Sequence, residues 1–387
     1  MDKIKKKWRV SNEEIVMIKK AINNKLSGKY LLEFESKLAK KFKVNYAVAV
    51  NSGTSALHSA LYAMGVKAGD EVIVPPLTFS ATAFAVIYLG AKPIFADVDI
   101  NTFNICPVSI EKKINKKTKA VITVSIFGLL PNMKEILKLK KKYKFMLLED
   151  NAETIFSKFK KKPSGTFGDI SIMSFQRSKH LTMGDGGAIL TNSKKLFLRS
   201  KQFSILGYRG LGKSKINENI KDKFQNPNYL RHEIVAPNYR MPEIIAAAGL
   251  AQLKKANFFL KQRRLIGKKY EEVCKKYLWV IYQKTPKHFS HSYWAFPFYL
   301  NTNKISWFEF RKKFIELGGD RFYAAWKLTY QEPALNHKLK KIYCKNAEFL
   351  QKKLILLKTN YLDNAKISKQ IRTLEKTLTY FQLKYKL

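Results

Sequence analysis

The segment that decides the fold is Ser174 to Gly187, which reads Ser-Phe-Gln-Arg-Ser-Lys-His-Leu-Thr-Met-Gly-Asp-Gly-Gly. Its one lysine, Lys179, lies between two β-prone runs, Ile170 to Phe175 and Ala188 to Thr191. A strand, a lysine loop, a glycine turn and a second strand hold an amine at the edge of a sheet. Such an amine can form a Schiff base with a carbonyl cofactor. Taken alone, Lys179 is more simply a solvated side chain, because lysine is the commonest charged residue of the chain.

The composition predicts a folded and strongly basic protein. Its 387 residues are 46% hydrophobic and 13% aromatic, enough for a large core and more than one lobe. A net charge of +44 suits an anionic partner, whether nucleic acid, a membrane surface or a phosphorylated small molecule. Because the lysines occur in separate runs, such as 3–7, 138–144 and 158–162, we interpret them as solvated faces that also attract a phosphate-bearing substrate.

The cysteines and the start of the chain bear on its location. Cys106, Cys274 and Cys344 are far apart and lack the spacing of metal ligands, which favours a reducing compartment. The first eight residues hold no apolar stretch, and no run approaches the roughly 20 apolar residues of a membrane span. We therefore expect a soluble, cytoplasmic protein with no membrane partner.

Strands and helices alternate through the first half of the chain, which predicts an α/β fold with a doubly wound, mainly parallel sheet. Helices are expected over 11–42, 51–64, 81–89 and 133–144, and strands over 46–50, 71–80, 92–99, 120–125, 145–150, 170–175 and 188–191. Residues 195–235 are expected to form loops and a helix.

The second half of the chain predicts a smaller lobe. A polar cap at 236–243 opens an apolar helix at 244–253, and a charged helical stretch at 254–270 bridges into that lobe. There we expect strands over 279–282 and 293–300, and helices over 307–317, 346–357 and 367–383. The predicted domains are therefore a large domain, 1–255, and a small C-terminal domain, 256–387.

Chemically useful residues follow several of the predicted strands. Ser52 to Ser55 opens a helix, where hydroxyls and free N–H groups can hold a phosphate, although Ser and Thr are also common helix caps. Phe79 and Asp150 lie at the ends of later strands. Open α/β sheets bind ligands beyond the carboxyl ends of their strands, so these groups and Lys179 are expected at one edge. A phosphate, a pyridine nitrogen and an aldehyde are the three handles of pyridoxal phosphate.

With these residues in place, the chain resembles the DegT/DnrJ/EryC1/StrS family of sugar aminotransferases. That family has the fold-type I architecture of pyridoxal-phosphate enzymes, with a large domain and a smaller α+β C-terminal domain. The matching motifs follow the family's order across residues 10 to 255: Asn51-Ser-Gly-Thr-Ser-Ala-Leu57, Thr78-Phe79, Asp97-Val-Asp99, Glu149-Asp-Asn-Ala-Glu153, Gly168-Asp169, Ser174-Phe175 with Lys179, Gly184-Asp-Gly-Gly187 and Asn238-Tyr-Arg-Met-Pro-Glu243.

The resemblance implies a role for each residue around the cofactor ring. Lys179 would form the Schiff base and later move a proton between substrate and cofactor carbons. Asp150 would pair with the pyridine nitrogen, Glu153 would lie near the ring hydroxyl, and Phe79 would stack on the ring.

The resemblance also implies phosphate contacts, a partner and a reaction. Gly53, Thr54 and Ser174 would hold the phosphate, and Asn238 would reach it from a second subunit, which implies a homodimer with shared sites. The implied substrate is a nucleotide-linked keto-deoxysugar, with L-glutamate as amino donor. The product would be an amino sugar for lipopolysaccharide O-antigen, another surface polysaccharide or a secondary metabolite, and a cyclitol or other keto sugar without a nucleotide is the alternative substrate.

Some positions depart from the family pattern. Asp185 replaces the usual Glu, Phe84 stands where many members have Asn, and Ser125 stands where many have His. The C-terminal lobe, including 323–327, matches much more loosely. The substrate is therefore the part of the reading that the resemblance defines least.

Other functions compete with aminotransfer. Related sugar 3-dehydratases carry His in place of the lysine and eliminate a hydroxyl, and here His180 follows Lys179. In both groups the active residue lies five positions before the first glycine of the quartet, and five before Gly184 is Lys179, which favours the aminotransferase. A non-catalytic regulator on the same fold is disfavoured by the intact Lys179 and Asp150. A nucleic-acid-binding protein would suit the charge, but no such motif is found.

Overall fold

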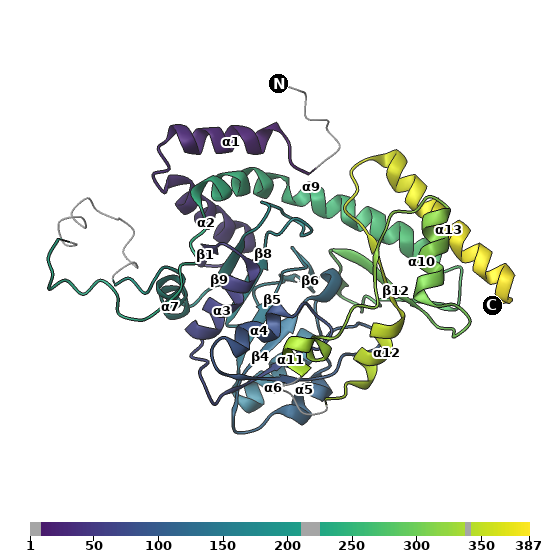
Figure 1. Ribbon diagram of the computed structural model, residues 1–387, viewed down its shortest axis with the longest axis horizontal. Helices are drawn as coiled ribbons and strands as arrows, with labels where there is room; N and C mark the ends of the chain where they lie inside the picture. The colour runs from purple at the N-terminus through teal and green to yellow at the C-terminus, as the bar shows by residue number, and fades with distance from the viewer. Residues whose placement is uncertain (1–8, 210–224, 337–341) are drawn as a thin grey trace.

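The computed structural model describes residues 9–209, 225–336 and 342–387 (Figure 1). In these residues the large sheet has seven strands in the order β1-β9-β8-β5-β4-β2-β3. The strands are β1 (Tyr46–Val50), β2 (Glu71–Val74), β3 (Lys92–Phe95), β4 (Thr118–Val124), β5 (Met146–Asp150), β8 (Ile170–Ser174) and β9 (Gly187–Thr191). β9 pairs antiparallel with both β1 and β8, whereas β8, β5, β4, β2 and β3 pair in parallel. The predicted α/β fold with a mainly parallel sheet is confirmed.

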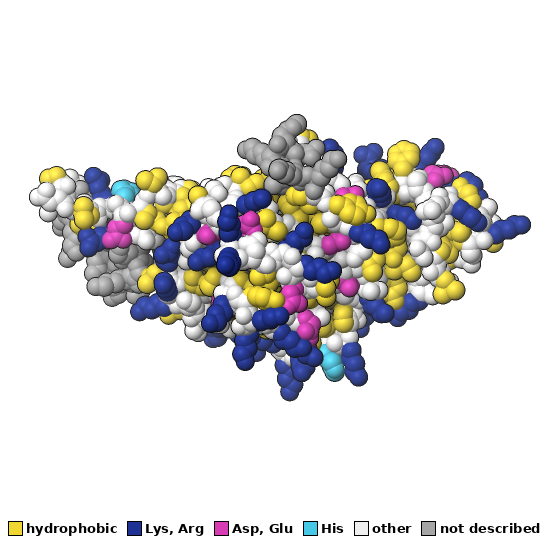
Figure 2. Space-filling model, turned by 90° about the horizontal axis from the view of Figure 1, so that it is seen from below, with side chains coloured by type: hydrophobic (Ala, Val, Ile, Leu, Met, Phe, Trp, Pro, Cys, Tyr) yellow, Lys and Arg dark blue, Asp and Glu magenta, His cyan; other side chains and the backbone are white. Residues whose placement is uncertain are grey.

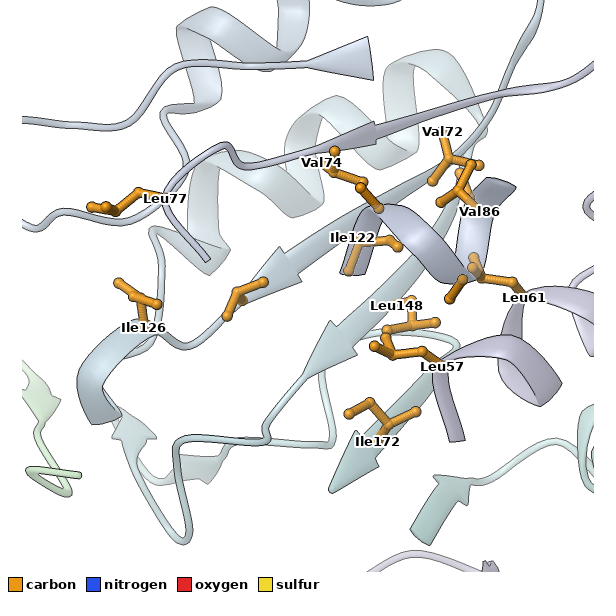
Figure 3. Packing of buried hydrophobic residues seen from close by; sticks show 14 of the residues in the cluster. Leu57, Leu61, Val72, Val74, Leu77, Val86, Ile122, Ile126, Leu148 and Ile172 are labelled. Atoms are coloured by element: carbon orange, nitrogen blue, oxygen red, sulfur yellow. The ribbon is translucent and has the colours of Figure 1, made fainter. Parts of the chain in front are cut away.

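Helices cover both faces of this sheet. They are α1 (Asn12–Asn23), α2 (Lys29–Phe42), α3 (Gly53–Ala63), α4 (Ala81–Ile87), α5 (Pro107–Lys113), α6 (Met133–Tyr143), α7 (Lys194–Ser204) and α9 (Glu243–Cys274). On one face Leu57 and Leu61 of α3 and Val86 of α4 pack on strand residues such as Ile122 and Leu148 (Figure 3). The other face is covered by α2 and α9 at one end and by α5 and α6 at the other. Each such buried aliphatic side chain contributes about 1.5–3 kcal/mol.

The second lobe is built around an antiparallel sheet. The described residues place four strands there in the order β10-β12-β14-β13: β10 (Val280–Tyr282), β12 (Ala295–Leu300), β13 (Tyr323–Ala324) and β14 (Leu354–Lys358). One face packs on the end of α9, on α10 (Trp307–Glu316) and on α13 (Asn364–Tyr385). Tyr299, Leu354 and Leu356 point into the core of the large domain instead. The two lobes therefore share buried apolar surface.

Short elements join these two sheets. They are η1 (Ile126–Gly128), η2 (Thr329–Gln331), α11 (Pro333–Asn336), α12 (Lys345–Lys353) and a small sheet of β6 (Lys158–Phe159), β7 (Lys162–Pro163) and β11 (Phe289–Ser290). Because β11 comes from the second lobe and pairs with β6, this sheet also ties the two lobes together.

One predicted helix is wrong in its last turn. Residues 346–357 were expected to be helical, but α12 ends at Lys353 and Leu354–Lys358 forms β14. The run Leu-Ile-Leu-Leu suits either state, and here it is buried between β12 and β13. The pairing with two neighbouring strands overrides the helical preference of leucine.

Helix α9 joins the two lobes without a break. It crosses the top of the molecule in Figure 1, with α1 packed along its first half. The segments predicted as an apolar helix and a charged bridge are thus one helix of 32 residues. The proposed division of the chain at residues 255 and 256 falls inside it. Its side chains change from the core of the large domain to that of the small one between Leu260 and Ile266.

The excess of basic residues is visible on the molecular surface. Figure 2 shows Lys and Arg side chains scattered over the face that it presents, with few carboxylates among them. The lysine run 3–7 and residues 210–224 of the expected loop region lie outside the described residues. Within the described ranges, no helix is both long and apolar enough to cross a membrane.

Candidate active site

The candidate site lies along the carboxyl edge of the large sheet. Strands β1, β5 and β8 end there, so Ser52, Asp150 and Ser174 reach the same edge, and β9 starts there at Gly187. Asp150 is buried, with 4% of its surface exposed. This arrangement brings together the groups that the sequence places at separate strand ends.

The start of helix α3 has the form expected of a phosphate cradle. Ser52 caps it, since its Oγ accepts the Ser55 N–H at 3.0 Å. The amides of Gly53 and Thr54 precede the first backbone hydrogen bond of the helix, which Ala56 donates to Ser52. These two N–H groups are the kind of helix-start donors that bind phosphate.

Gly53 and Ser174 touch each other across this cradle. A Cβ atom on Gly53 would lie 2.9 Å from Ser174 Cβ and 3.2 Å from its Oγ. Glycine is therefore required for the helix start to approach the end of β8 this closely. The amides of Gly53 and Thr54 and the nearby hydroxyl of Ser174 are donors of the kind that fit the phosphate of pyridoxal phosphate.

We expect Gly53→Ala to weaken binding of pyridoxal phosphate about tenfold or more, because its methyl group would push Ser174 out of the cradle. Titration of the cofactor-free protein, followed by cofactor absorbance, measures this affinity. In a Ser174→Gly background the same Gly53→Ala change should cost less than about threefold, since the colliding side chain is gone. An equal cost in both backgrounds would show that the clash is not the cause.

Lys179 carries its amine into a small group of side chains. Lys179 Nζ lies 3.3 Å from Glu153 Oε1 and 4.6 Å from the centre of the Trp294 ring. The lysine and glutamate side chains are 15% and 11% exposed. The other oxygen of Glu153, Oε2, accepts the Phe127 N–H at 3.0 Å. The amine is thus held near the sheet edge rather than in bulk solvent.

Trp294 and Phe127 are site residues that the sequence did not reveal. Phe127 has φ 58°, an uncommon conformation for a bulky residue, and its carbonyl accepts the Trp294 N–H at 2.8 Å. The two rings are stacked, with centroids 6.5 Å apart. Both residues come from segments without a family motif, so no local sequence signal identifies them. In this strained conformation Phe127 donates its backbone N–H to Glu153 and accepts the backbone N–H of Trp294 at its carbonyl.

The surroundings of Asp150 suit a carboxylate that pairs with a bound cation. Its Oδ1 accepts the Ala152 N–H at 3.0 Å and its Oδ2 accepts the Thr82 hydroxyl at 3.2 Å. Burial raises the pKa of Asp150 to about 6, against smaller lowering effects of the Ala152 amide and the Lys179 charge. A protonated pyridine nitrogen beside this carboxylate would relieve that cost. The residues therefore fit the ring of the cofactor.

The raised pKa of Asp150 predicts how the cofactor-free protein responds to pH. Between about pH 4 and pH 6 the folded state binds a proton here that the unfolded chain has lost, so stability falls as pH rises through this window. The free energy of unfolding of wild type minus that of Asp150→Asn should fall by up to about 3 kcal/mol across it. Urea unfolding at a series of pH values measures this. A flat difference would contradict the assignment.

His180, the neighbour of Lys179, has a structural environment. Its Nε2–H donates to the Ser292 carbonyl at 3.0 Å, and its Nδ1 has no partner among the described residues. Burial, aided by the charge of Arg263, holds the pKa of His180 well below its usual value. The His180 imidazole is buried and hydrogen-bonded to the Ser292 backbone, whereas the Lys179 amine lies beside Glu153 and Trp294.

Two further predicted residues, Phe79 and Asn238, lie at the surface of the described chain. Phe79, just beyond β2, is 79% exposed, so its ring is available for stacking. Asn238 is exposed, and its Oδ1 accepts from Arg240 Nε at 3.0 Å. Phe84 is half-buried against the core, and the buried Ser125 donates its hydroxyl to Asn151 at 3.0 Å. At these two atypical positions, Phe84 and Ser125, the described residues show no polar side-chain atom without a hydrogen-bond partner.

Several motif residues hold the fold instead of the site. The carboxylate of Asp97 accepts the N–H groups of Asn346 and Ala347, at 2.9 and 3.0 Å, and so caps α12. The buried carboxylate of Glu149 accepts three N–H groups, from Gly165, Phe167 and Gly168. Burial raises the pKa of Glu149 as well.

Comparison with known proteins gives a consistent assignment. The sequence model described as the DegT/DnrJ/EryC1/StrS aminotransferase family matches residues 9–369. The chain is 40% identical over 267 residues to a GDP-perosamine synthase of Escherichia coli O157:H7, which covers 69% of this chain and 68% of that relative.

Solved structures with the same overall fold include several enzymes of this type. PseC of Helicobacter pylori, an aminotransferase of pseudoaminic acid biosynthesis, has a TM-score of 0.85 at 26% identity and covers 97% of this chain and 98% of its own. GDP-4-keto-6-deoxymannose-3-dehydratase with bound GDP-perosamine has a TM-score of 0.84 at 25% identity, covering 95% and 98%. The overall fold therefore does not separate amine transfer from dehydration.

Proposed function

Since the chain belongs to the DegT/DnrJ/EryC1/StrS aminotransferase family, we propose that it transfers an amino group to a GDP-linked keto-deoxysugar, with pyridoxal phosphate as its cofactor. The observation that carries this proposal is the Lys179 amine, held 3.3 Å from Glu153 at the edge that also holds Asp150 and the phosphate cradle. The GDP-linked substrate is supported by the 40% identity to a GDP-perosamine synthase.

Each residue proposed to lie around the pyridoxal phosphate ring would have its own role. Pyridoxal phosphate, when bound, supplies an aldehyde that reacts with amines and a ring that accepts electrons. Lys179 Nζ is the proposed catalytic group, which gives up and takes back a proton beside the reacting carbon. Glu153 is proposed to orient the amine and to lie near the ring hydroxyl, and Asp150 would keep a proton on the ring nitrogen. Phe79 is proposed to cover one face of the ring.

The phosphate contacts extend the proposal to a second subunit. Gly53, Thr54 and Ser174 are proposed to hold the cofactor phosphate, with the partner subunit's Asn238 completing the site in a homodimer. The exposure of Asn238 supports this, because the side chain is available to another chain.

The setting of the reaction is part of the same proposal. L-glutamate is the proposed amino donor, and the amino sugar would enter surface polysaccharide such as lipopolysaccharide O-antigen. A relative in Bacillus subtilis named spore coat polysaccharide biosynthesis protein SpsC supports the polysaccharide setting. The free cysteines Cys106, Cys274 and Cys344 support a cytoplasmic location.

A panel of keto sugars tests the proposed substrate. The purified holoenzyme is incubated with glutamate and with keto-deoxysugars linked to GDP, UDP or dTDP, or with a free keto-cyclitol, and 2-oxoglutarate release is coupled to a spectrophotometric assay. We expect the GDP-linked sugar to give the highest kcat/KM. Turnover of another nucleotide sugar would correct the nucleotide, and turnover of a free keto-cyclitol alone would overturn the substrate class.

The same structures keep a sugar 3-dehydratase as the second candidate. The dehydratase with bound GDP-perosamine has a TM-score of 0.84 and PseC one of 0.85, so the fold is compatible with both reactions. The contacts of Lys179 with Glu153 and Trp294, and of His180 with Ser292, favour amine transfer instead.

A further inference from the structure

Two buried arginines from outside the family motifs hold the backbone of the Lys179 turn. Arg263, in the middle of α9, donates from Nη2 to the carbonyls of Ser178 and Lys179, at 3.3 and 3.5 Å. Arg9, just before α1, donates to the carbonyls of Arg177 and Lys179. The backbone of the turn is thus held by guanidinium groups from two separate parts of the chain.

Arg263 also ties this turn to the second lobe. Its Nη1 donates to the Trp294 carbonyl at 2.6 Å and to the Thr359 hydroxyl at 3.0 Å. The Trp294 indole N–H in turn donates to the Ser178 carbonyl at 3.0 Å, while its ring lies 4.6 Å from Lys179 Nζ. One guanidinium therefore places both the backbone of Lys179 and the ring beneath its amine.

Burying these two arginines lowers the stability of the folded state. Arg263 is 2% exposed and Arg9 is 5% exposed. Among the described residues neither forms an ion pair with a carboxylate, and the oxygens that accept their hydrogen bonds are neutral. Burial, followed by the charge of Arg9, lowers the pKa of Arg263 well below its usual value, and burial lowers that of Arg9 to about 10. Buried charges without counter-ions are a poor source of stability, so their position against the lysine turn points to a role in function.

We propose that Arg9 and Arg263 form a clamp that positions Lys179, and that Arg263 is the positioning residue that keeps the amine aligned with Trp294. The clamp touches the backbone of the catalytic lysine and not the reacting atoms. The inference rests on the proposed catalytic role of Lys179.

The planar fork of arginine is what the clamp requires. Lysine keeps the charge but presents a compact ammonium group that cannot serve four acceptors arranged around a plane. Arg263→Lys should therefore leave the charge in place and loosen the turn. Arg264 is a matched control, since it is the next residue of α9 and its guanidinium binds the backbone of His291 at 2.9 Å and Phe156 at 3.4 Å without contacting the lysine turn.

The experiment compares the holoenzymes of wild type, Arg263→Lys and Arg264→Lys. For Arg263→Lys we expect kcat to fall at least about tenfold with KM for both substrates within about twofold, because positioning is lost and binding is kept. The cofactor-free form of each variant is also mixed with pyridoxal phosphate, reduced with borohydride at timed intervals and digested. Mass spectrometry of the Lys179 peptide should show slower capture, at least about fivefold, in Arg263→Lys alone.

Several results would overturn the clamp. If Arg264→Lys loses kcat and capture rate to the same extent, the effect is a general weakening of α9. If Arg263→Lys keeps both within twofold, the clamp does not position the lysine. Should Arg263→Lys fail to fold, Arg9→Lys is measured in its place, and normal capture in that variant would contradict the proposal.

The same measurements separate this inference from the proposed function. Wild type that captures pyridoxal phosphate at Lys179 but aminates no sugar would overturn the substrate and leave the clamp testable by capture. Wild type that aminates the sugar while Arg263→Lys behaves normally would overturn the clamp alone.

Discussion

Replacing Lys179 with alanine is expected to reduce amine transfer by about 10⁴-fold or more. The Lys179 amine is the group proposed to be both nucleophile and proton carrier, and each of these functions contributes orders of magnitude. Its neighbours cannot replace it, because Glu153 accepts a hydrogen bond from the Phe127 amide and Trp294 offers only an aromatic ring. Single-turnover measurement of 2-oxoglutarate release checks the loss, and the absorbance of the covalently bound cofactor should vanish with it.

Two controls make this prediction specific. Lys179→Arg keeps the positive charge near Glu153 and should be as inactive as the alanine variant, since a guanidinium does not act as a nucleophile. Lys140→Ala removes another partly buried lysine, paired with Asp169 at 3.0 Å where β8 begins, at the opposite edge of the sheet, and should keep kcat within about twofold. Activity of Lys179→Ala near that of wild type would remove Lys179 from the reaction.

Replacing Asp150 with asparagine is expected to lower kcat by about 10²- to 10³-fold. The carboxylate is buried and would pair with a protonated ring nitrogen, an interaction that is strong because water is excluded. Asparagine keeps the shape and the hydrogen bond from Ala152 but carries no charge. The cofactor should still bind, since the cradle at Gly53 is untouched. Steady-state kinetics at saturating cofactor measures the loss.

Thr82 is the control for this second prediction. Its hydroxyl donates to Asp150 Oδ2 at 3.2 Å, so Thr82→Val removes one hydrogen bond and leaves the carboxylate charge. We expect a loss of at most about tenfold, in keeping with one hydrogen bond to a charged group. If Thr82→Val and Asp150→Asn lose activity equally, the charge of Asp150 is not what the reaction needs.

The parts of the site that the sequence reveals are those that sit directly after strands. Strand β1 matches the predicted residues 46–50, and the end of β5 at Asp150 was predicted as well. These are local features, because a buried strand followed by polar residues is visible in a short window. The spacing from Gly184, which favours Lys179 over His180, comes instead from the resemblance to the family.

The parts that the sequence hides depend on contacts across the fold. Trp294, just before β12, and Arg263 of α9 both contact the lysine turn, and no short segment of sequence reveals these contacts. Strand β14 was mistaken for helix because the pattern of leucines fits both states until neighbouring strands decide. Asp97 lies in a motif yet caps α12 from 250 residues away, so a motif alone does not separate fold from function.

The central claim is that this protein moves an amino group, and [¹⁵N]glutamate tests it most directly. The holoenzyme is incubated with labelled glutamate and a GDP-linked keto-deoxysugar, and the product is analysed by mass spectrometry. We expect a product in which the keto oxygen is replaced by ¹⁵N and the other sugar oxygens are kept. A product that lacks a hydroxyl and holds no ¹⁵N would contradict it and identify a dehydratase.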